Sequence, residues 1–202
     1  MKMKQQKRVQ PSKKIEESLS YSVEVRDKEG RIIKRVSAPS RSYVEQWNQL
    51  INTKMSDANK TIRDTDGIEQ DIVPSAWLFI GTAVIGDITR GIRVGKGATA
   101  VAIDDYALET PCGEGTGTDE FNHQAVVFTA PAVVGSTCSF TLKRIMVNNS
   151  GATISGIREI GQYLSLTLVA LRGLGFRDVL PSAVTVLDGG SITVIYTIAA
   201  TV

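Results

Sequence analysis

The sequence predicts a mainly β protein: an antiparallel, jelly-roll-like β-sandwich with an N-terminal hairpin, one α-helix and an extended basic N-terminal arm. From residue 77 onward, short apolar or alternating runs recur at fairly even spacing, separated by Gly, Asp, Asn or Pro. That pattern is typical of a sandwich or barrel. Helical spacing of apolar residues is convincing in one segment only. We expect three regions: the arm at 1–19, a hairpin, helix and loop region at 20–72, and the β-sandwich body at 73–202.

The arm begins with MKMKQQKRVQPSKK, which holds six basic residues and no acidic one. Because the net charge of the whole chain is only +2, the remainder is mildly acidic. The basic start is not followed by the apolar run of a secretory signal, and no stretch is long enough to span a membrane. We therefore expect synthesis and use inside a cytoplasm. The predicted partner-binding residues are Lys2, Lys4, Lys7, Arg8, Lys13 and Lys14.

Two interpretations of the arm are open: a solubilising tail, or a tether that becomes ordered on the acidic surface of a partner. We favour the tether. Nucleic acid is the weaker candidate partner, because the arm holds no aromatic residue on which a base can stack.

A β-hairpin is expected after the arm, because 20–26 alternates polar and apolar residues, 27–30 has turn chemistry, and 31–36 resumes an apolar run. The chain becomes polar between 56 and 70, where DTDG at 64–67 is a turn. We expect a loop with one short hairpin there.

The helix is predicted over 41–55, with Ser40 or Ser42 as its N-cap. Its apolar face consists of Tyr43, Trp47, Leu50 and Ile51, which recur at spacings of three and four. Trp77, like Trp47, stands in an apolar pattern that predicts burial.

Seven strands are expected in the body, at 77–83, 91–95, 124–129, 136–147, 163–171, 183–187 and 191–200. Turns are expected at NNSG (148–151) and DGG (188–190), and the last two strands are expected to form a hairpin. In 191–200 one face is wholly apolar, so this strand should be paired on both edges or covered. That face consists of Ile192, Val194, Tyr196 and Ile198.

No catalytic residue, metal or cofactor is predicted. The sole histidine, His123, has no partner at a recognisable spacing, so we interpret it as a polar or surface residue; a triad built from distant positions stays open. No GxSxG motif surrounds a serine. Cys112 and Cys138 lack the spacing of a disulfide framework or a redox motif, and we expect both to be reduced, structural thiols.

Three motifs suggest ligands and have plainer interpretations that we favour. The glycine-rich run 91–97 lacks the spacing of a phosphate loop and predicts a strand ending in a glycine turn. The acidic residues at 64–71 lack a complete calcium-loop pattern and predict a turn. The cluster Asp104, Asp105 and Glu109 predicts solvated charges or salt-bridge partners rather than a cation site.

The C-terminal half resembles a family of tailed-bacteriophage virion proteins. The resemblance lies in GIRVGKGATAVAIDDYALETPCGEGTG, NNSGATI, REIGQYL and RDVLPSAVTVLDGGSITVIYTI, which together span roughly 91–202. Similar proteins also carry an N-terminal hairpin followed by an aromatic-containing helix. Two departures are Gln162, where an apolar residue is common, and the insertion-like stretch 155–158. The recurring positions correspond to Asn148, Asn149, Gly151, Glu159, Gly161, Arg177, Asp178, Pro181, Val184 and Gly190.

This resemblance implies a non-enzymatic structural component of a virion, without choosing among capsid surface, neck, tail and fibre. The expected partners are other virion proteins and copies of the chain itself, with no membrane and with assembly in the host cytoplasm. The polar loops 56–72 and 104–122 are then expected to be interface elements. The alternative is a module that recognises host-surface carbohydrate, which the low aromatic content of 6% disfavours. A cytoplasmic enzyme is a third, weaker hypothesis.

Overall fold

The computed structural model describes residues 16–40, 42–74, 78–167 and 171–202. The prediction of a mainly β fold with one helix is confirmed. The elements are β1 (Glu16–Arg26), β2 (Ile32–Ser40), α1 (Glu45–Ser56), β3 (Lys60–Arg63), β4 (Glu69–Ile72), β5 (Gly91–Gly95), β6 (Gly113–Glu114), β7 (Glu120–His123), β8 (Val127–Phe128), β9 (Ala132–Val134), β10 (Thr137–Val147), β11 (Ile154–Ser165), β12 (Arg172–Val186) and β13 (Ser191–Thr201).

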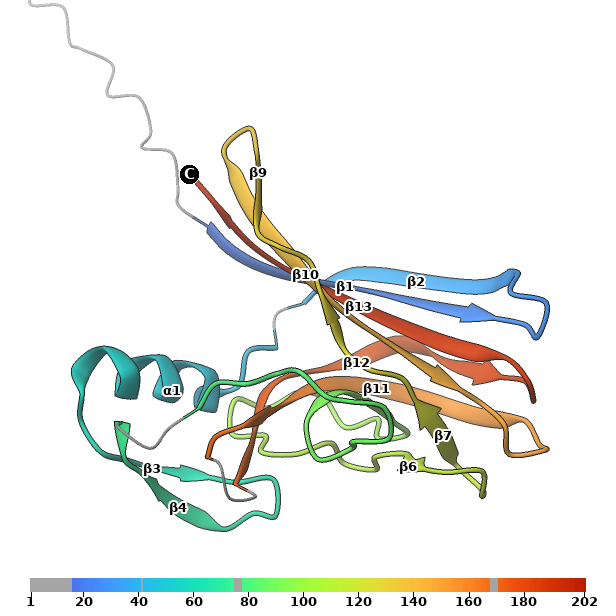
Figure 1. Cartoon of the computed structure of the whole chain (residues 1–202), viewed down its shortest axis with the longest axis horizontal. Helices are drawn as coiled ribbons and strands as arrows, with labels where there is room; N and C mark the ends of the chain where they lie inside the picture. Colours follow the sequence, from blue (N-terminus) through green and yellow to red (C-terminus); the bar gives the residue numbers. More distant parts are fainter. Residues whose placement is uncertain (1–15, 41, 75–77, 168–170) are drawn as a thin grey trace, which may run out of the picture.

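Two sheets pack against each other and form the sandwich (Figure 1). The large sheet has the order β2-β1-β13-β10-β7-β6, with β8 and β9 also paired to β10. The small sheet has the order β12-β11-β5, and β3 pairs with β4 in a separate hairpin. Apolar side chains from both sheets and from α1 form one core cluster. The hairpin region 20–36 and the body therefore share a sheet, because β1 pairs with β13 along its whole length.

The strand predicted at 191–200 lies at the centre of the large sheet, as its pattern requires. β13 pairs with β1 on one edge and with β10 on the other. Ile192, Val194 and Tyr196 are fully buried. Alternation with a period of two placed these side chains on the core face.

The hairpin predicted for the last two strands is wrong. Strand 183–187 is the end of β12 in the small sheet, whereas β13 belongs to the large sheet. The turn at 188–190 therefore crosses from one sheet to the other, as does the segment between β10 and β11. Gly and Asp encode a reversal of the chain locally, but the pairing partner depends on which strand completes the core.

Other strand limits also differ from the prediction. In the described part of 77–83 there is no strand, only an isolated bridge between Ile80 and Ser165, and Trp77 lies outside the described residues. Within 124–129 only β8 is a strand, and 163–171 is divided between the end of β11 and residues outside the described ranges. The insertion-like stretch 155–158 belongs to β11 as an irregularity, with register shifts and a positive φ of 76° at Gly156.

The N-terminal hairpin is confirmed as β1 and β2, although β1 begins at Glu16 rather than residue 20. The short hairpin predicted around 64–67 is confirmed as β3 and β4. Helix α1 begins at Glu45 rather than 41, and its N-cap, Val44, makes no side-chain hydrogen bond. Neither Ser40 nor Ser42 caps it. The predicted apolar face is confirmed: Trp47 and Leu50 are buried, and Tyr43 and Ile51 pack partly buried against the core.

Candidate docking surface

The six predicted partner-binding residues, Lys2, Lys4, Lys7, Arg8, Lys13 and Lys14, lie outside the described residues. The structure does describe the point where the arm joins the sandwich. Glu16, the first described residue, pairs with Thr201 near the C-terminus. Thr201 also pairs with Thr137 of β10, which faces Val134 of β9. These strand ends form one end of the large sheet, which we call the sheet extension.

The sheet extension projects beyond the small sheet and α1 (Figure 1). Every residue from Val127 to Ser136 is exposed, and Val133 and Val134 are 71% and 79% exposed. From Phe121 to Leu142 the sequence holds no Asp, Glu, Lys or Arg. Within the described residues β9 pairs with β10 only, so its other edge is open. Uncharged apolar edges of this kind are normally covered by another protein surface.

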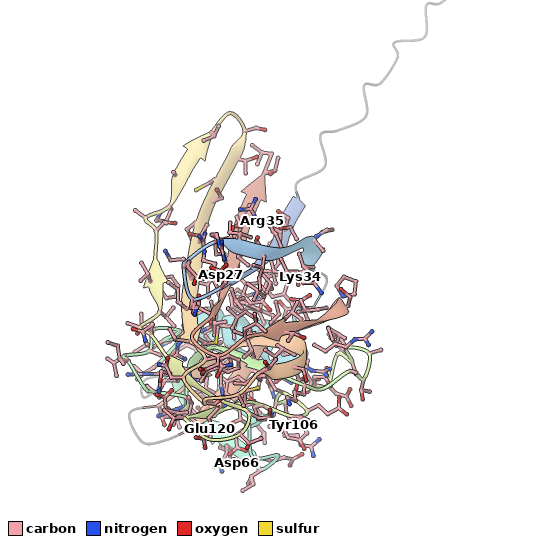
Figure 2. All side chains as sticks on the ribbon, turned by 90° about the vertical axis from the view of Figure 1, so that its right-hand side faces the viewer. Asp27, Lys34, Arg35, Asp66, Tyr106 and Glu120 are labelled. Carbon is pink, nitrogen blue, oxygen red and sulfur yellow. The ribbon has the colours of Figure 1, made fainter. Side chains whose placement is uncertain are left out.

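The opposite end of the molecule is acidic. Segment 56–72 holds five acidic and two basic residues, and segment 104–120 holds six acidic residues and no basic one. Asp66 and Glu120, one in each segment, lie near each other at the far end from the sheet extension, as Figure 2 shows. Since the arm is basic and joins at the extension, the chain is electrically polarised along its length.

Segment 96–110 is held in place by a buried carboxylate, that of Glu159. Its Oε1 accepts hydrogen bonds from the backbone N–H groups of Gly97 and Thr110 at 2.9 and 2.7 Å. Its Oε2 accepts one from the N–H of Glu109 at 2.9 Å. A side chain at Gly95 would collide with this carboxylate, which is the structural reason for the glycine. The predicted strand and glycine turn at 91–97 are confirmed.

Arg177 completes this ionic cluster. Its Nε donates to Oε2 of Glu159 at 3.0 Å, and its Nη1 donates to Asp105 at 2.9 Å. Nη2 lies 3.6 Å from the Glu109 carboxylate. Burial alone would lower the pKa of Arg177, but the hydrogen bonds and charges of Glu159 and Asp105 raise it. The interpretation of Asp105 and Glu109 as salt-bridge partners is therefore confirmed.

A second buried cation, Arg144, holds the segment before β5. Its guanidinium donates to the backbone carbonyls of Gln124 and Asp87, both at 2.7 Å, and of Ile92 at 3.1 Å. Burial lowers the pKa of Arg144 to about 10, so it remains protonated at neutral pH. The sequence carried a signal that was missed, since Arg144 stands between Leu142 and Met146 on the inward face of β10.

The interpretation of His123 as a surface residue is wrong, because the side chain is fully buried. Its Nδ1 lies 2.7 Å from Oε2 of Glu114. Burial, reinforced by the charge of Arg144, lowers its pKa to about 4 despite this carboxylate. A neutral imidazole that donates from Nδ1 to Glu114 is the consistent state at neutral pH.

Asp178 is a third buried anchor. Its Oδ2 accepts hydrogen bonds from Ser40 Oγ at 2.9 Å and from Tyr196 OH at 3.1 Å. Burial raises the pKa of this carboxyl group. Ser40 and Ser42, whose hydroxyls lie 2.6 Å apart, thus tie β2 to the core rather than cap the helix.

The remaining polar motifs have plain roles. Asp64 accepts from the backbone N–H groups of Asp66 and Ile68, which confirms the predicted turn. Across the described ranges, no three His, Cys, Asp or Glu residues are placed to share a metal ion. Both cysteines are free thiols; Cys112 is buried and Cys138 is exposed on β10.

No protein-family model, curated protein or solved structure matches this chain. None of the helices in the described ranges has the length and apolar character needed to cross a membrane.

Proposed function

We propose that this chain is a non-enzymatic structural component of a tailed-phage virion. It docks through its basic N-terminal arm and its sandwich onto neighbouring capsid, neck or tail subunits. The observation that carries the proposal is the sheet extension, where the arm joins beside an exposed, uncharged and open-edged strand, β9. Tether and apolar contact surface thus share one end of the molecule, as two parts of one interface.

The residues that carry the family resemblance support a scaffold rather than a reaction centre. Glu159 and Arg177 neutralise each other and fix segment 96–110. Asp178 ties β2 to β13. Asn148 joins the two turns that connect the sheets. Each of these polar groups is engaged in holding backbone or a neighbouring side chain.

A carbohydrate-recognition module has less support. Sugar sites combine an exposed aromatic platform with several polar groups that bind hydroxyls. The aromatic side chains that gather on this molecule surround a mostly apolar pocket, whose buried polar side chain is Gln162.

Removal of residues 1–14 tests the proposal. Each exposed ion pair contributes about 0.2–1 kcal/mol, so the six cations must act together. We expect the truncated chain to keep its β-rich circular-dichroism spectrum and to lose most of its incorporation into particles. Attachment of the full chain should also weaken as salt rises, because exposed charges are screened.

Two arm variants of unchanged length separate charge from length. In one, all six basic residues become Gln; in the other, the order of residues 2–14 is scrambled with the charges kept. The scrambled arm should support incorporation and the Gln arm should not. Full incorporation of the Gln arm at physiological and high salt would show that the arm is only a tail.

A further inference from the structure

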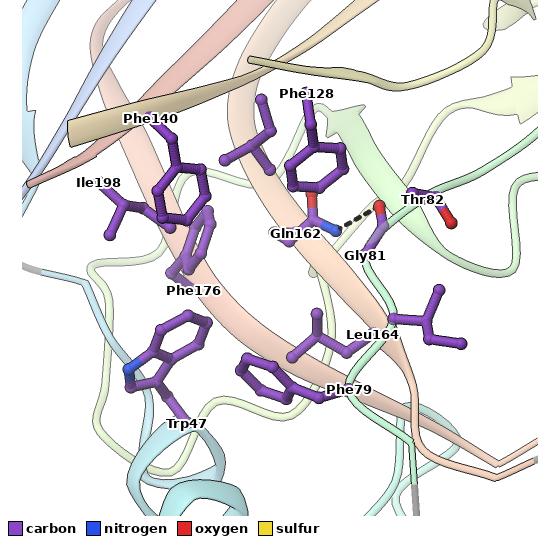
Figure 3. A pocket seen from close by; sticks show the side chains of 12 residues that line it. Trp47, Phe79, Gly81, Thr82, Phe128, Phe140, Gln162, Leu164, Phe176 and Ile198 are labelled. Atoms are coloured by element: carbon purple, nitrogen blue, oxygen red, sulfur yellow. Dashed lines mark hydrogen bonds between the residues drawn. The ribbon is translucent and has the colours of Figure 1, made fainter. Parts of the chain in front are cut away.

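An aromatic pocket of about 390 Å³ opens between the two sheets, beside the sheet extension. Helix α1 contributes Trp47 and the segment before β5 contributes Phe79. The sheets contribute Phe128, Phe140 and Phe176 (Figure 3). The volume falls in the range of sites that bind a compact organic group.

One polar side chain in the wall of this pocket has an unmet hydrogen-bonding capacity. Gln162 of β11 is 1% exposed. Its Nε2 donates to the carbonyls of Gly81 and Tyr163 at 3.0 and 2.9 Å. Because only the NH₂ group can donate to two carbonyls, these bonds fix the orientation of the amide. Oε1 therefore stays an acceptor, and it has no hydrogen-bond partner among the described residues.

Figure 3 shows the Gln162 amide between Gly81 and Phe128, with its oxygen directed toward Phe128. The neighbours of Gln162 on the same face of β11, Ile160 and Leu164, are apolar and buried. A buried acceptor without a donor destabilises a protein, so an amide at this position calls for an explanation. A donor supplied from outside the chain provides one.

The surface around the pocket restricts the nature of that donor. Phe128 belongs both to the pocket and to the uncharged stretch between Phe121 and Leu142. A complementary occupant therefore carries no charge, presents an apolar and preferably aromatic body to the rings, and directs one N–H or O–H to Oε1. The adjoining exposed residues of β9 favour a protein surface over a free small molecule, because they too require cover.

We propose that this pocket receives a tyrosine or tryptophan side chain of a protein partner, whose O–H or N–H donates to Gln162 Oε1. Tyrosine and tryptophan are the residues that most often anchor protein interfaces, because they join a large apolar ring to one donor. The β8 to β10 hairpin flanks the anchor and supplies the surrounding apolar contact. This inference does not depend on the virion role.

Two capped peptides that differ by one oxygen atom test it: acetyl-Gly-Tyr-Gly-amide and acetyl-Gly-Phe-Gly-amide, titrated into the full-length chain and followed by NMR. We expect the Tyr peptide to bind about three- to tenfold more tightly, the effect of one added hydrogen bond. In Gln162→Leu that preference should vanish while the Phe peptide still binds. Gln124→Leu, a control outside the pocket, should keep the preference.

Equal binding of the two peptides to the wild-type chain, or no binding of either, overturns the proposal. A preference for Tyr that survives in a folded Gln162→Leu variant also overturns it. Titration with p-cresol and toluene separates the other occupant: if p-cresol depends on Gln162 and neither peptide binds, the pocket serves a free small molecule and the docking proposal is wrong.

Discussion

At the scale of single residues, buried ionisable groups do the work of positioning loops. Glu159 and Arg177 are both almost wholly buried and hydrogen-bonded to each other. The carboxylate also binds three backbone N–H groups of segment 96–110. Removing one charge leaves the other buried without its partner, which costs far more than the net contribution of the pair.

We therefore expect Glu159→Gln to lower the free energy of unfolding by about 3–5 kcal/mol, measured by urea denaturation. Glu109→Gln is the matched control: its side chain is 46% exposed and its contact with Arg177 is long, at 3.6 Å. That change should cost less than about 1 kcal/mol. Equal losses for the two variants would contradict the anchoring role of Glu159.

His123 predicts a pH dependence of stability. Its pKa is about 4 in the folded chain and about 6.5 in the unfolded chain. Between these values the unfolded chain binds the extra proton, so stability falls as pH decreases from 6.5 toward 4. The loss amounts to about 3 kcal/mol once both pKa values are passed.

The free energy of unfolding measured from pH 7 to pH 4 checks this prediction when wild type is compared with His123→Gln. The variant cannot take up that proton, so its stability should fall less steeply, and the difference between the two curves reports His123 alone. Parallel curves would mean that the histidine titrates normally in the folded chain.

At the scale of elements, the two connections between the sheets support each other. The backbone N–H of Asn148 donates to the carbonyl of Gly190, and that of Gly189 donates to the carbonyl of Asn148. The N–H of Gly151 donates to the Asp188 carboxylate at 2.8 Å. The turn after β10 and the turn after β12 therefore lie side by side and cross between the sheets together.

Asn148 is the central residue of this pair of turns. Its buried Nδ2 donates to the carbonyls of Ala152 and Val186 at 2.8 and 3.0 Å. We expect Asn148→Ala to lower the free energy of unfolding by about 2–4 kcal/mol, because it leaves buried carbonyls unpaired. The exposed neighbour Asn149 provides the control, and Asn149→Ala should cost under about 0.5 kcal/mol in the same denaturant titration. A similar cost at both positions would argue against the proposed role of the turns.

At the scale of the whole molecule, the sandwich is one cooperative body. Its core cluster draws residues from β1, α1, β5 and both sheets. The hairpin region contributes β1 to the centre of the large sheet, between β2 and β13. We expect no independent unfolding of 20–72 ahead of the body.

The buried thiol of Cys112 tests this cooperativity. Burial raises its pKa to about 11, so it should react with thiol reagents only after unfolding, whereas the exposed Cys138 should react in the native state. The slow labelling of Cys112 and the loss of far-UV circular dichroism should follow the same transition in urea. Labelling of Cys112 well below that transition would reveal a separable region.

The sequence by itself determined the β class, the N-terminal hairpin, the turns and the apolar faces of β13 and α1. These features follow from local patterns, such as alternation in Ile192, Val194 and Tyr196. Local chemistry also identified Asp64 as a turn residue and Asp105 as a salt-bridge partner.

Tertiary structure alone decided which strands pair and where the charged residues point. The turn at 188–190 fits a hairpin or a crossing between sheets equally well, and only burial of both flanking strands on opposite sides of one core selects the crossing. His123 and Arg144 are buried because distant carboxylates and carbonyls compensate them, and no local pattern reports partners so far along the chain. The pocket around Gln162 likewise exists only where α1, β8 and β12 meet β11, since its walls come from segments far apart in the sequence.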